Sequence, residues 1–469
     1  MTSQGQVVLG VDSSTQSTKV LAVEVETGEV LARGQAPHTV TGGAGRESDP
    51  EEWWQALLDA FGQLGEYAGR ADAVSVGGQQ HGLVVLDAAG RPLRPALLWN
   101  DVRSAPQADA LVERYGAGRW AQRFGSVPGA SFTVTKWEWL RAHEPEAAAG
   151  AWGVRLPHDF LTERLSGVAV TDRGDASGTG WWASETEEYD EALLAEIGLD
   201  PKRLPTVLGP GEGAGTVRER LPLRAGALVA AGTGDNAAAA LGLGLTPGRA
   251  VLSLGTSGTV YAVSRQRPTD PTGTVAGFAA AGGGWLPLAC TLNCTLAVDK
   301  VAQLLGRGRE EVEAGGSVAF LPFLDGERTP NLPYASGLLT GLRHETTAGQ
   351  VLQGAYDGAV WALLRALDEV LAVDGGAPSG EPLLLIGGGA RGVAWRETVR
   401  RLSGRAVQVP VAGELVALGA AVQAASLLTG EAPTDIAHRW STAKGTLYDP
   451  VPRDDDTLAR LSAALPLAG

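Results

Sequence analysis

The sequence has little of what marks disulfide-stabilised, metal-binding or membrane-spanning proteins. Its 469 residues include two cysteines, Cys290 and Cys294, too few for a disulfide framework or a zinc site, so we expect two reduced thiols. The six histidines follow no metal-ligand spacing. No run approaches the roughly 18 consecutive apolar residues of a membrane span, and no basic segment precedes the first short apolar run. We therefore expect a cytoplasmic protein without a membrane span.

Basic residues are also in the minority. Lysine and arginine number 38 against 53 aspartates and glutamates, a net charge of -15 that argues against nucleic acid or an anionic membrane surface as a partner. Hydrophobic residues make up 44% of the chain, enough for more than one large core, and the length predicts two large domains. The 65 glycines show no collagen-like period, so many of them should form tight turns or lie close to a ligand.

A hairpin pattern occurs twice. Apolar residues 6–11 predict a strand that ends at Asp12, and a hydroxyl-rich loop follows before a second apolar strand over residues 20–25. Residues 250–263 repeat the arrangement, with a loop of glycine, threonine and serine between two strands. The repeat predicts two related halves, each presenting a polar loop at the tip of a hairpin.

Strand and helix patterns alternate along the rest of the chain. Apolar strands over 73–76, 227–231 and 383–386 each run into a polar or glycine-rich corner, and an apolar stripe predicts a helix over residues 350–373. This alternation predicts an α/β fold. The best candidate for a hinge between domains is the proline-containing stretch 241–249.

Two aspartates stand where phosphoryl transfer would need them. Asp12 precedes a run of hydroxyl residues, and one carboxylate beside hydroxyls can hold a hydrated magnesium ion next to phosphates. Asp235 follows a glycine-rich corner and opens an alanine-rich helix, whose N-terminus favours the ionised carboxylate. Asp235 is interpreted either as an N-cap or as a proton acceptor, and the two roles are compatible.

The sequence lacks the common phosphate-binding motif of nucleotide-binding proteins. A Walker loop, GxxxxGK[ST], is absent, so any nucleotide must be held in another way. Gly387, Gly389 and Gly392 fit the GxGxxG pattern of dinucleotide sites, with Glu414 at the offset of a ribose-binding acid. Too little chain remains after Glu414 for the rest of such a sheet. Glycines that let the backbone approach an adenosine or a phosphate explain this corner with fewer assumptions.

Several motifs together resemble one known family. In chain order they are Gly10-Val11-Asp12 with its hydroxyl loop, Gln80-His81-Gly82, Leu98-Trp99-Asn100-Asp101, Gly234-Asp235-Asn236, Leu254-Gly255-Thr256-Ser257-Gly258, Leu321-Pro322 with Gly326-Glu327-Arg328-Thr329-Pro330, and Gly387-Gly388-Gly389-Ala390-Arg391. This series resembles the FGGY-type carbohydrate kinases over essentially the whole chain. The similarity is greatest to the family members that phosphorylate D-xylulose.

The resemblance implies a fold and an activity. The expected fold is α/β, with two actin-like (ribonuclease H-like) ATPase domains and a catalytic cleft between them. The N-terminal domain, residues 1–244, would carry the sugar site and the first phosphate loop, and the C-terminal domain, residues 245–469, the nucleotide site. The implied reaction transfers the γ-phosphate of ATP to the 5-hydroxyl of D-xylulose with Mg²⁺ as cofactor. Sugar and ATP are then the partners, and because dimers are common in such proteins, a homodimer is one expected state.

The resemblance also assigns roles to individual residues. It makes Asp235 the catalytic base and Asp12 the carboxylate near magnesium and ATP, places Gln80, His81 and Asn236 at the sugar, and gives the phosphates and nucleotide to Thr15, Ser17, Gly255, Thr256, Gly388 and Gly389. Two positions depart from the family pattern. Gln80 stands where many bacterial members have methionine, which leaves the sugar preference open, and Lys19 stands where some relatives have arginine.

The mechanism expected from these residues is in-line displacement with Asp235 as proton acceptor. In a loose transition state the proton leaves late, so a carboxylate of ordinary pKa suffices. Other interpretations stay open at this point. The acceptor could be another sugar or polyol, such as L-ribulose, glycerol or gluconate, and a non-catalytic sugar sensor could share the fold.

Overall fold

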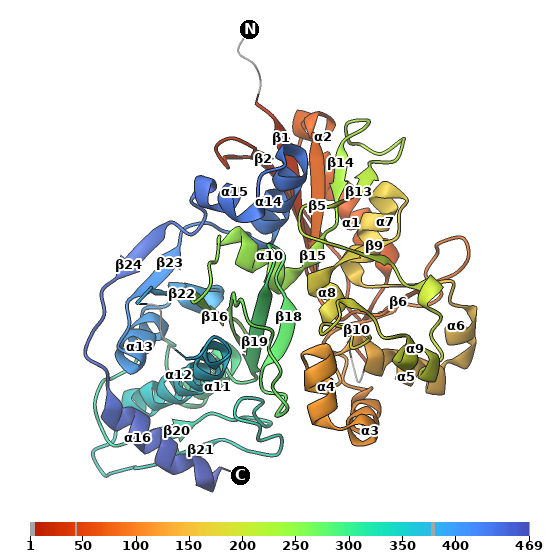
Figure 1. The fold of residues 1–469 in the computed structure, drawn as a ribbon. Coiled ribbons are helices and arrows are strands. Elements are labelled where there is room, and N and C mark those ends of the chain that lie inside the picture. The colour runs from red at the N-terminus through yellow and green to blue at the C-terminus, as the bar shows by residue number, and fades with distance from the viewer. Residues whose placement is uncertain (1–4, 43–44, 377–379, 469) are drawn as a thin grey trace.

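The chain folds into two lobes, each built around a seven-stranded sheet (Figure 1). A computed structural model describes residues 5–42, 45–376 and 380–468. Strands and helices alternate in both lobes, which confirms the predicted α/β class. The helix predicted over residues 350–373 is observed as α12 (Ala348–Ala372).

The sheet of the N-terminal lobe combines an antiparallel meander with parallel strands. Its order is β13 (Gly213–Thr216), β14 (Leu228–Ala230), β5 (Ala73–Gly78), β1 (Val7–Ser13), β2 (Ser17–Glu24) and β3 (Val30–Pro37), with β15 (Thr233–Gly234) also on β5. β1, β2 and β3 are antiparallel neighbours, whereas β5 runs parallel to β1 and β14 runs parallel to β5. All seven residues of β1 are buried, because helices cover both faces of the sheet there.

The second sheet repeats this plan. Its order is β18 (Ala276–Ala279), β19 (Trp285–Thr291), β17 (Gly258–Ala262), β16 (Ala250–Leu254), β22 (Leu383–Ile386), β23 (Val407–Pro410) and β24 (Gly445–Tyr448). β16 pairs antiparallel with β17 and parallel with β22, just as β1 pairs with β2 and β5. The hairpin repeat predicted from the sequence is therefore confirmed.

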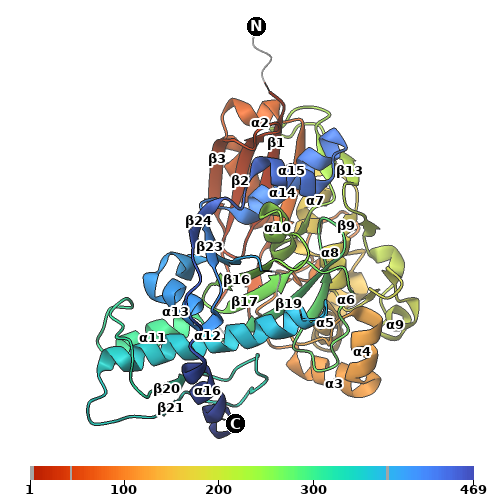
Figure 2. The same ribbon diagram turned by 60° about the vertical axis from the view of Figure 1, so that its left-hand side comes forward.

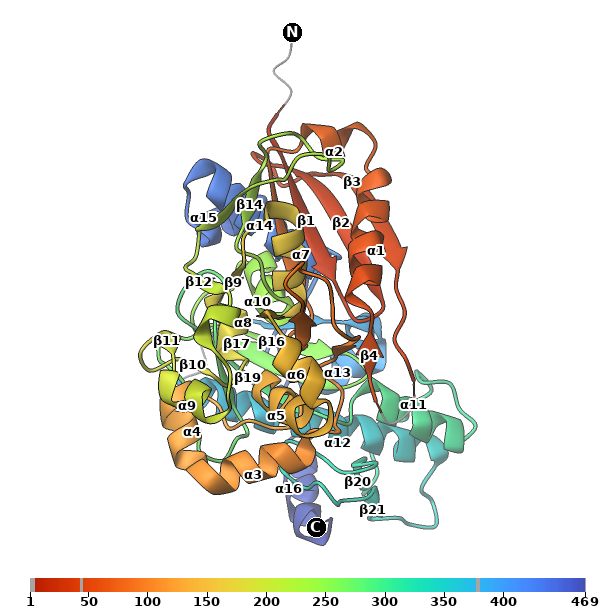
Figure 3. The ribbon, with the colours of Figure 1, turned by 90° about the vertical axis from the view of Figure 1, so that its right-hand side faces the viewer.

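The N-terminal lobe holds ten helices within its described residues. They are α1 (Pro50–Gly62), α2 (Glu66–Arg70), α3 (Ala105–Tyr115), α4 (Ala117–Phe124), α5 (Thr133–His143), α6 (Pro145–Gly150), α7 (Pro157–Ser166), α8 (Arg173–Ser177), α9 (Glu191–Glu196) and α10 (Asp235–Gly242). Helix α1 lies along β2 and β3 (Figure 3). It begins at a proline after the N-cap Asp49 and buries one face, which includes Trp53 and Phe61.

The later helices come from the second half of the sequence. They are α11 (Thr295–Leu304), α12, α13 (Val393–Ser403), α14 (Leu415–Thr429), α15 (Pro433–Trp440) and α16 (Asp455–Ala464). α12 runs beneath β17 and β19 and is the longest helix of the described chain (Figure 2). Its start is fixed by a capping box of Thr347 and Gln350.

Helix α14 belongs to the second half of the sequence but packs on the sheet of the first. It lies against β1, β5 and α10, next to the first lobe in Figure 1. The backbones touch, since a Cβ on Gly10 would come within 1.9 Å of the Ala417 carbonyl oxygen, and one on Gly419 within 1.8 Å of the Ala238 carbonyl oxygen. α14 therefore connects the two lobes. The domain boundary between residues 244 and 245 stays a prediction.

Both lobes also contain two-stranded sheets outside the main sheet. They are β4 (Glu47–Ser48) with β7 (Ala96–Leu97), β6 (Val84–Leu86) with β8 (Gly153–Arg155), β9 (Val170–Asp172) with β12 (Thr206–Leu208), β10 (Trp182–Ala183) with β11 (Glu188–Tyr189), and β20 (Ala319–Leu321) with β21 (Leu338–Thr340).

In the described chain no single helix has the length and apolar character to cross a membrane, and only α14 and α15 taken together do, with a bend of 120° between them.

Candidate active site

Asp12 lies at the end of β1, where the chain turns into the first hairpin loop. Ser14 donates a hydrogen bond to Asp12 Oδ1 over 2.6 Å, and Lys19 Nζ lies 3.7 Å from Oδ2. Burial raises the pKa of this carboxyl, and the bonds from Ser14 and Lys19 offset that rise only in part. Lys19 is in turn paired with Glu414 at 2.8 Å. Lys19 and Glu414 thus bridge the two halves beside Asp12, a contact that sequence reasoning did not find.

Asp235 is the first residue of α10, at the end of β15. Its Oδ1 accepts hydrogen bonds from the backbone N–H and the side-chain amide of Asn236, over 2.7 and 2.9 Å. The N-cap is Gly234, so the N-cap interpretation of Asp235 is off by one residue. The mechanism requires no elevated pKa, but burial, and then the charges of Asp12 and Asp175, raise the pKa of Asp235 to about 7. The helix N-terminus does not outweigh these effects.

The two aspartates open into one cavity between the lobes. Its volume is about 590 Å³, and it is lined by Asp12, Lys19, Asp235, Asn236, Ala239, Ser253, Tyr261, Leu385, Ile386, Gly387, Gly388, Ala390, Arg391, Val409, Pro410, Ala412, Gly413, Glu414, Leu415 and Val416. The predicted base, the predicted metal-side carboxylate and the glycine corner of the second lobe therefore share one space. The other predicted residues, Thr15, Ser17, Gln80, His81, Gly255, Thr256 and Gly389, are outside this lining.

The first hairpin loop lies at the edge of the cavity. Thr15 accepts a hydrogen bond from the indole of Trp99 over 3.2 Å, and the half-buried Ser17 begins β2. Trp99 itself remains 43% exposed, so it acts as a wall beside the loop rather than as core. The predicted motif around Trp99 and the loop thus meet in space, although 84 residues separate them.

The second hairpin loop and the glycine corner lie together in the second lobe. The Gly255 carbonyl accepts hydrogen bonds from the backbone N–H and the hydroxyl of Thr295, at the start of α11, while Thr256 is exposed. Gly389 packs on Leu254, since a Cβ there would come within 2.8 Å of that side chain. A Cβ on Gly388 would meet nothing within 4 Å. The corner therefore presents bare, accessible backbone on the side of the cavity.

Gln80 and His81 follow β5, next to the Asp235 corner. Gln80 is buried, and its Oε1 accepts a hydrogen bond from the Asn236 amide over 3.0 Å. His81 has a left-handed backbone with φ 64°, stacks on Phe132 at 5.0 Å, and its Nδ1 lies 2.8 Å from the Gly178 carbonyl oxygen. Burial lowers the pKa of His81 to about 3, so the ring is neutral at physiological pH.

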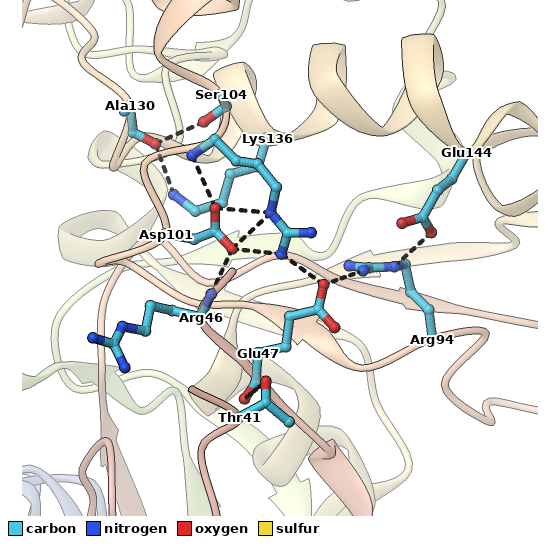
Figure 4. A network of polar contacts seen from close by, with 10 residues as sticks. Thr41, Arg46, Glu47, Arg94, Asp101, Ser104, Ala130, Lys136 and Glu144 are labelled. Carbon is cyan, nitrogen blue, oxygen red and sulfur yellow. Dashed lines mark hydrogen bonds and ion pairs between the residues drawn. The ribbon is translucent and has the colours of Figure 1, made fainter. Parts of the chain in front are cut away.

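Asp101, from the predicted Leu98–Asp101 motif, is the centre of an ion-pair network rather than a cavity residue (Figure 4). It accepts hydrogen bonds from the Arg46 backbone and from the Arg103 guanidinium, which also reaches Glu47. Arg103 holds the pKa of this buried carboxyl below its usual range, against the effect of burial. The network fixes the loop that carries Trp99.

Lys136, which no sequence motif singles out, lies in the same network. Its ammonium group is buried and donates to the carbonyl of Ala130 (Figure 4) and to that of Ser131. Burial lowers the pKa of Lys136 to about 7. These bonds hold the loop before Phe132 and so the ring on which His81 stacks. A buried lysine with only carbonyl partners has no signal in a single sequence.

Comparisons with known proteins agree with this architecture. The N-terminal domain model of the FGGY family of carbohydrate kinases matches residues 7–242, and its C-terminal domain model matches residues 250–428. Two xylulose kinases, of Streptomyces rubiginosus and Streptomyces coelicolor, are each 68% identical over 466 residues, which cover 99% of this chain and 96% of each relative. The crystal structure of a xylulose kinase from Bifidobacterium adolescentis, 35% identical, superposes with a TM-score of 0.86 over 98% of this chain and 99% of that one.

Proposed function

Because the chain belongs to the FGGY family of carbohydrate kinases, we propose that it transfers the γ-phosphoryl group of ATP to the 5-hydroxyl of D-xylulose, which gives D-xylulose 5-phosphate and ADP. The observation that carries this proposal is the cavity in which Asp235 and Asp12 face the open Gly387–Gly388 backbone. The sugar comes from the relatives, which are xylulose kinases at 68% identity over nearly their whole length.

Asp235 acts as the proton acceptor. Asn236 occupies its Oδ1 with two N–H groups, and within the described residues no hydrogen bond reaches Oδ2. The sugar hydroxyl gives its proton to Oδ2 while its oxygen forms a bond to the γ-phosphorus and the bond from that phosphorus to the ADP oxygen breaks. With a pKa of about 7, Asp235 is a better base than an ordinary carboxylate and is still partly ionised at neutral pH.

The two hairpin loops and the glycine corner hold the phosphates. Backbone N–H groups of Gly388 and Gly389, together with the hydroxyls of Thr15, Ser17 and Thr256, supply neutral donors to the nucleotide. Gly388 suits this role because no other atom covers the position of its absent side chain. Holding the reacting groups in line lowers the barrier chiefly by positioning them.

Mg²⁺ fits the donor set around Asp12. Among the described residues no cluster of three histidine, cysteine or acidic side chains could enclose a metal, but magnesium needs only one or two carboxylates and keeps phosphate and water ligands. The buried Asp12 carboxylate, whose raised pKa reflects incomplete compensation, would hold the ion. The ion would neutralise charge on the phosphates, and Lys19 keeps Asp12 oriented toward the cavity.

The sugar would lie against Gln80, His81 and Asn236. The stacking of His81 on Phe132 and its contact with Phe278 at 5.5 Å join a ring from the first lobe to one from the second. These stacked rings beside Gln80 would keep water from the proposed sugar site, which would limit hydrolysis of ATP.

The test is an ADP-release assay over a panel of acceptors: D-xylulose, L-ribulose, glycerol and gluconate. We expect the highest kcat/KM with D-xylulose, and a higher value with another acceptor would move the protein to that substrate. D235N provides the matched control, because it should bind ATP without forming ADP. Sugar binding by the wild-type protein with no ADP formed from any acceptor would instead favour a non-catalytic sensor.

The proposal extends to the partners of the protein, its location and its oligomeric state. The acidic net charge of -15 supports small-molecule partners, the sugar and ATP, over nucleic acid or membrane lipid, in a cytoplasmic enzyme. Size-exclusion chromatography with light scattering tests whether the protein is a homodimer.

A further inference from the structure

Strand β18 forms one edge of the second sheet, yet all four of its residues are buried. It pairs with β19 on one side, and its other side faces α8 of the first lobe (Figure 1). An edge strand leaves a row of backbone N–H and C=O groups without a partner strand. Because buried backbone groups are almost always paired, the free edge of β18 needs partners from the first lobe.

Two serine hydroxyls supply these partners. The N–H of Gly277 donates to Ser126 Oγ and the N–H of Ala279 donates to Ser177 Oγ, each over 2.9 Å. Both serines are buried, with exposed fractions of 2% and 1%. The Ser177 hydroxyl gives its own proton to the Gly174 carbonyl over 2.5 Å, so its oxygen is an acceptor toward β18. The serines therefore take the place of a neighbouring strand.

The backbones of the two lobes also approach each other along this edge. A Cβ on Gly277 would come within 2.5 Å of the Gly125 carbonyl oxygen, and a Cβ on Gly174 within 3.1 Å of the Ala279 carbonyl oxygen. Glycine at these positions allows the close approach that the serine hydrogen bonds require. The position of β18 relative to the first lobe is therefore fixed on both sides of Phe278.

Phe278, between the two bonded residues, contacts the proposed sugar site. Its buried ring lies 5.5 Å from that of His81 and 6.3 Å from that of Phe132, measured between ring centroids. His81 is held by the residue that follows Ser177, because its Nδ1 lies 2.8 Å from the Gly178 carbonyl oxygen. Residues 177 and 178 thus bind β18 and His81 side by side.

This arrangement fixes the ring of His81. A carbonyl oxygen only accepts, so Nδ1 carries the proton of the neutral ring and Nε2 is an acceptor. Within the described residues no hydrogen bond reaches Nε2. A sugar hydroxyl can donate to this atom as long as the ring keeps its orientation, which Gly178, Phe132 and Phe278 determine.

We propose that Ser177 is a positioning residue for sugar binding: its hydroxyl holds β18 so that Phe278, from the second lobe, packs on His81 and keeps Nε2 toward the sugar. The inference rests on the contact of His81 with the sugar proposed above. The second lobe, predicted to hold the nucleotide, would thereby also complete the sugar site.

The test begins with S177A, which leaves the buried Ala279 N–H without an acceptor. We expect KM for the sugar to rise about tenfold, because Phe278 and His81 are no longer held in place. KM for ATP should stay within about twofold of the wild type, since three strands separate β18 from β22 and the Gly387–Gly388 corner. Steady-state kinetics with each substrate varied in turn measures both constants.

A double-mutant cycle with F278L tests whether the effect passes through the ring. F278L should itself raise KM for the sugar, because leucine cannot stack on His81. In the F278L background S177A should raise it by no more than about twofold further, because the ring that Ser177 positions is already absent. An undiminished tenfold increase in that background would overturn the proposal.

S184A is the matched control. Ser184 is also buried where the lobes meet, but its hydroxyl accepts from Arg267 over 3.2 Å and not from β18. S184A should leave KM for the sugar within about twofold of the wild type. Equal increases in S184A and S177A, or equal increases of both KM values in S177A, would show that these serines only hold the lobes together.

The assay uses the acceptor that the wild-type protein phosphorylates best, so a different preferred acceptor would overturn the substrate proposed above and leave this test intact. If no acceptor is phosphorylated, titration calorimetry with D-xylulose measures the same expected tenfold change as a Kd, and absence of D-xylulose binding by the wild type would overturn both proposals. Should S177A fail to fold, S126A removes the other bond to β18 and should raise KM for the sugar a few-fold. An unchanged KM in S126A would then contradict the proposal.

Discussion

The two lobes have the same strand plan but supply different chemistry. In each, a hairpin packs beside a parallel strand, so β1, β2 and β5 correspond to β16, β17 and β22. Asp12 is the next-to-last residue of β1, and the matching position is Gly255, directly after β16. At these matching positions the N-terminal lobe therefore presents an acidic side chain, and the C-terminal lobe presents backbone.

The difference is one of burial as much as of residue type. Asp12 is buried and Asp235 is half-buried in the cavity wall, and desolvation raises the pKa of each. Gly387 and Gly388 are exposed on the opposite wall. Phosphoryl transfer needs a base on the acceptor side, and a metal and neutral donors around the phosphates. A duplicated scaffold can supply these groups because the residues at its matching loops differ.

Among the substitutions that test the difference between the two lobes, D235N should have the largest effect on kcat. D235N removes the proposed proton acceptor but keeps the shape of the corner, so kcat should fall by on the order of 10² to 10⁴. Titration calorimetry should still show ATP binding, since the nucleotide wall belongs to the other lobe. Near-normal turnover would remove Asp235 from its role.

Substitutions at the matching positions Asp12 and Gly255 test whether the two lobes have different roles. D12N should lower kcat about a hundredfold and raise the Mg²⁺ concentration needed for half-maximal rate, because the metal loses its carboxylate. G255D introduces a carboxylate on the nucleotide side, where it repels phosphate, and should raise KM for ATP about tenfold with a smaller change in kcat. Similar effects of the two variants on Mg²⁺ dependence would mean that the lobes are not specialised in this way.

The pH dependence tests the burial of the acidic lobe. With a pKa of about 7, Asp235 is increasingly protonated below that pH, so kcat should fall by about tenfold per pH unit on the acid side. His81, whose pKa is about 3, does not titrate in this range. A kcat that stays constant down to pH 5 would contradict the raised pKa.

The free energy of unfolding should change with pH in the opposite sense to kcat. A carboxyl with an ordinary pKa of 3.8 that rises to about 7 on folding removes stability as the pH increases between these values. D235N should therefore have a higher melting temperature than the wild type at pH 8, and the difference should vanish near pH 4. Equal melting temperatures at pH 8 would show that the buried charge is compensated.

Two adjacent glycines of the nucleotide wall give the smallest expected effects. G388A meets no protein atom within 4 Å, so the melting temperature should not change, while KM for ATP should rise a few-fold because the methyl group enters the phosphate space. G389A would come within 2.8 Å of Leu254 and should lower stability by about 1–3 kcal/mol. Unchanged KM for ATP in G388A would mean that the nucleotide does not approach this backbone.

Much of the scaffold could be predicted from the sequence because its signals are local. The two hairpins, the helix over residues 350–373 and the glycine corner follow from apolar periodicity and turn residues, and each is observed. The aspartates could be selected because a carboxylate at a strand end beside hydroxyls or glycines is a recognisable pattern. The gathering of Asp12, Asp235 and Gly388 into one cavity followed only from the resemblance to a family.

Other parts of the site have no local signal. The pairing of Lys19 with Glu414 joins residues from opposite halves of the chain, and Lys136 is an ordinary helix residue until its burial is known. His158 on α7 lies within 3.5 Å of Asp159, Asp172 and Asp175, residues of α7, β9 and α8 that share no motif. Asp172 in turn accepts a hydrogen bond from Thr233, two residues before Asp235.

The sequence by itself therefore determined which residue types are present, where the chain turns, and that the two halves are related. Tertiary structure decided the protonation of Asp235, because desolvation and the nearby charges of Asp12 and Asp175 depend on distances that no local pattern encodes. It also decided that α14, from the second half, packs closely on the first sheet at Gly10 and on α10 at Gly419. Local propensity specifies the elements, whereas the electrostatics of the site arise only when elements distant in sequence are packed together.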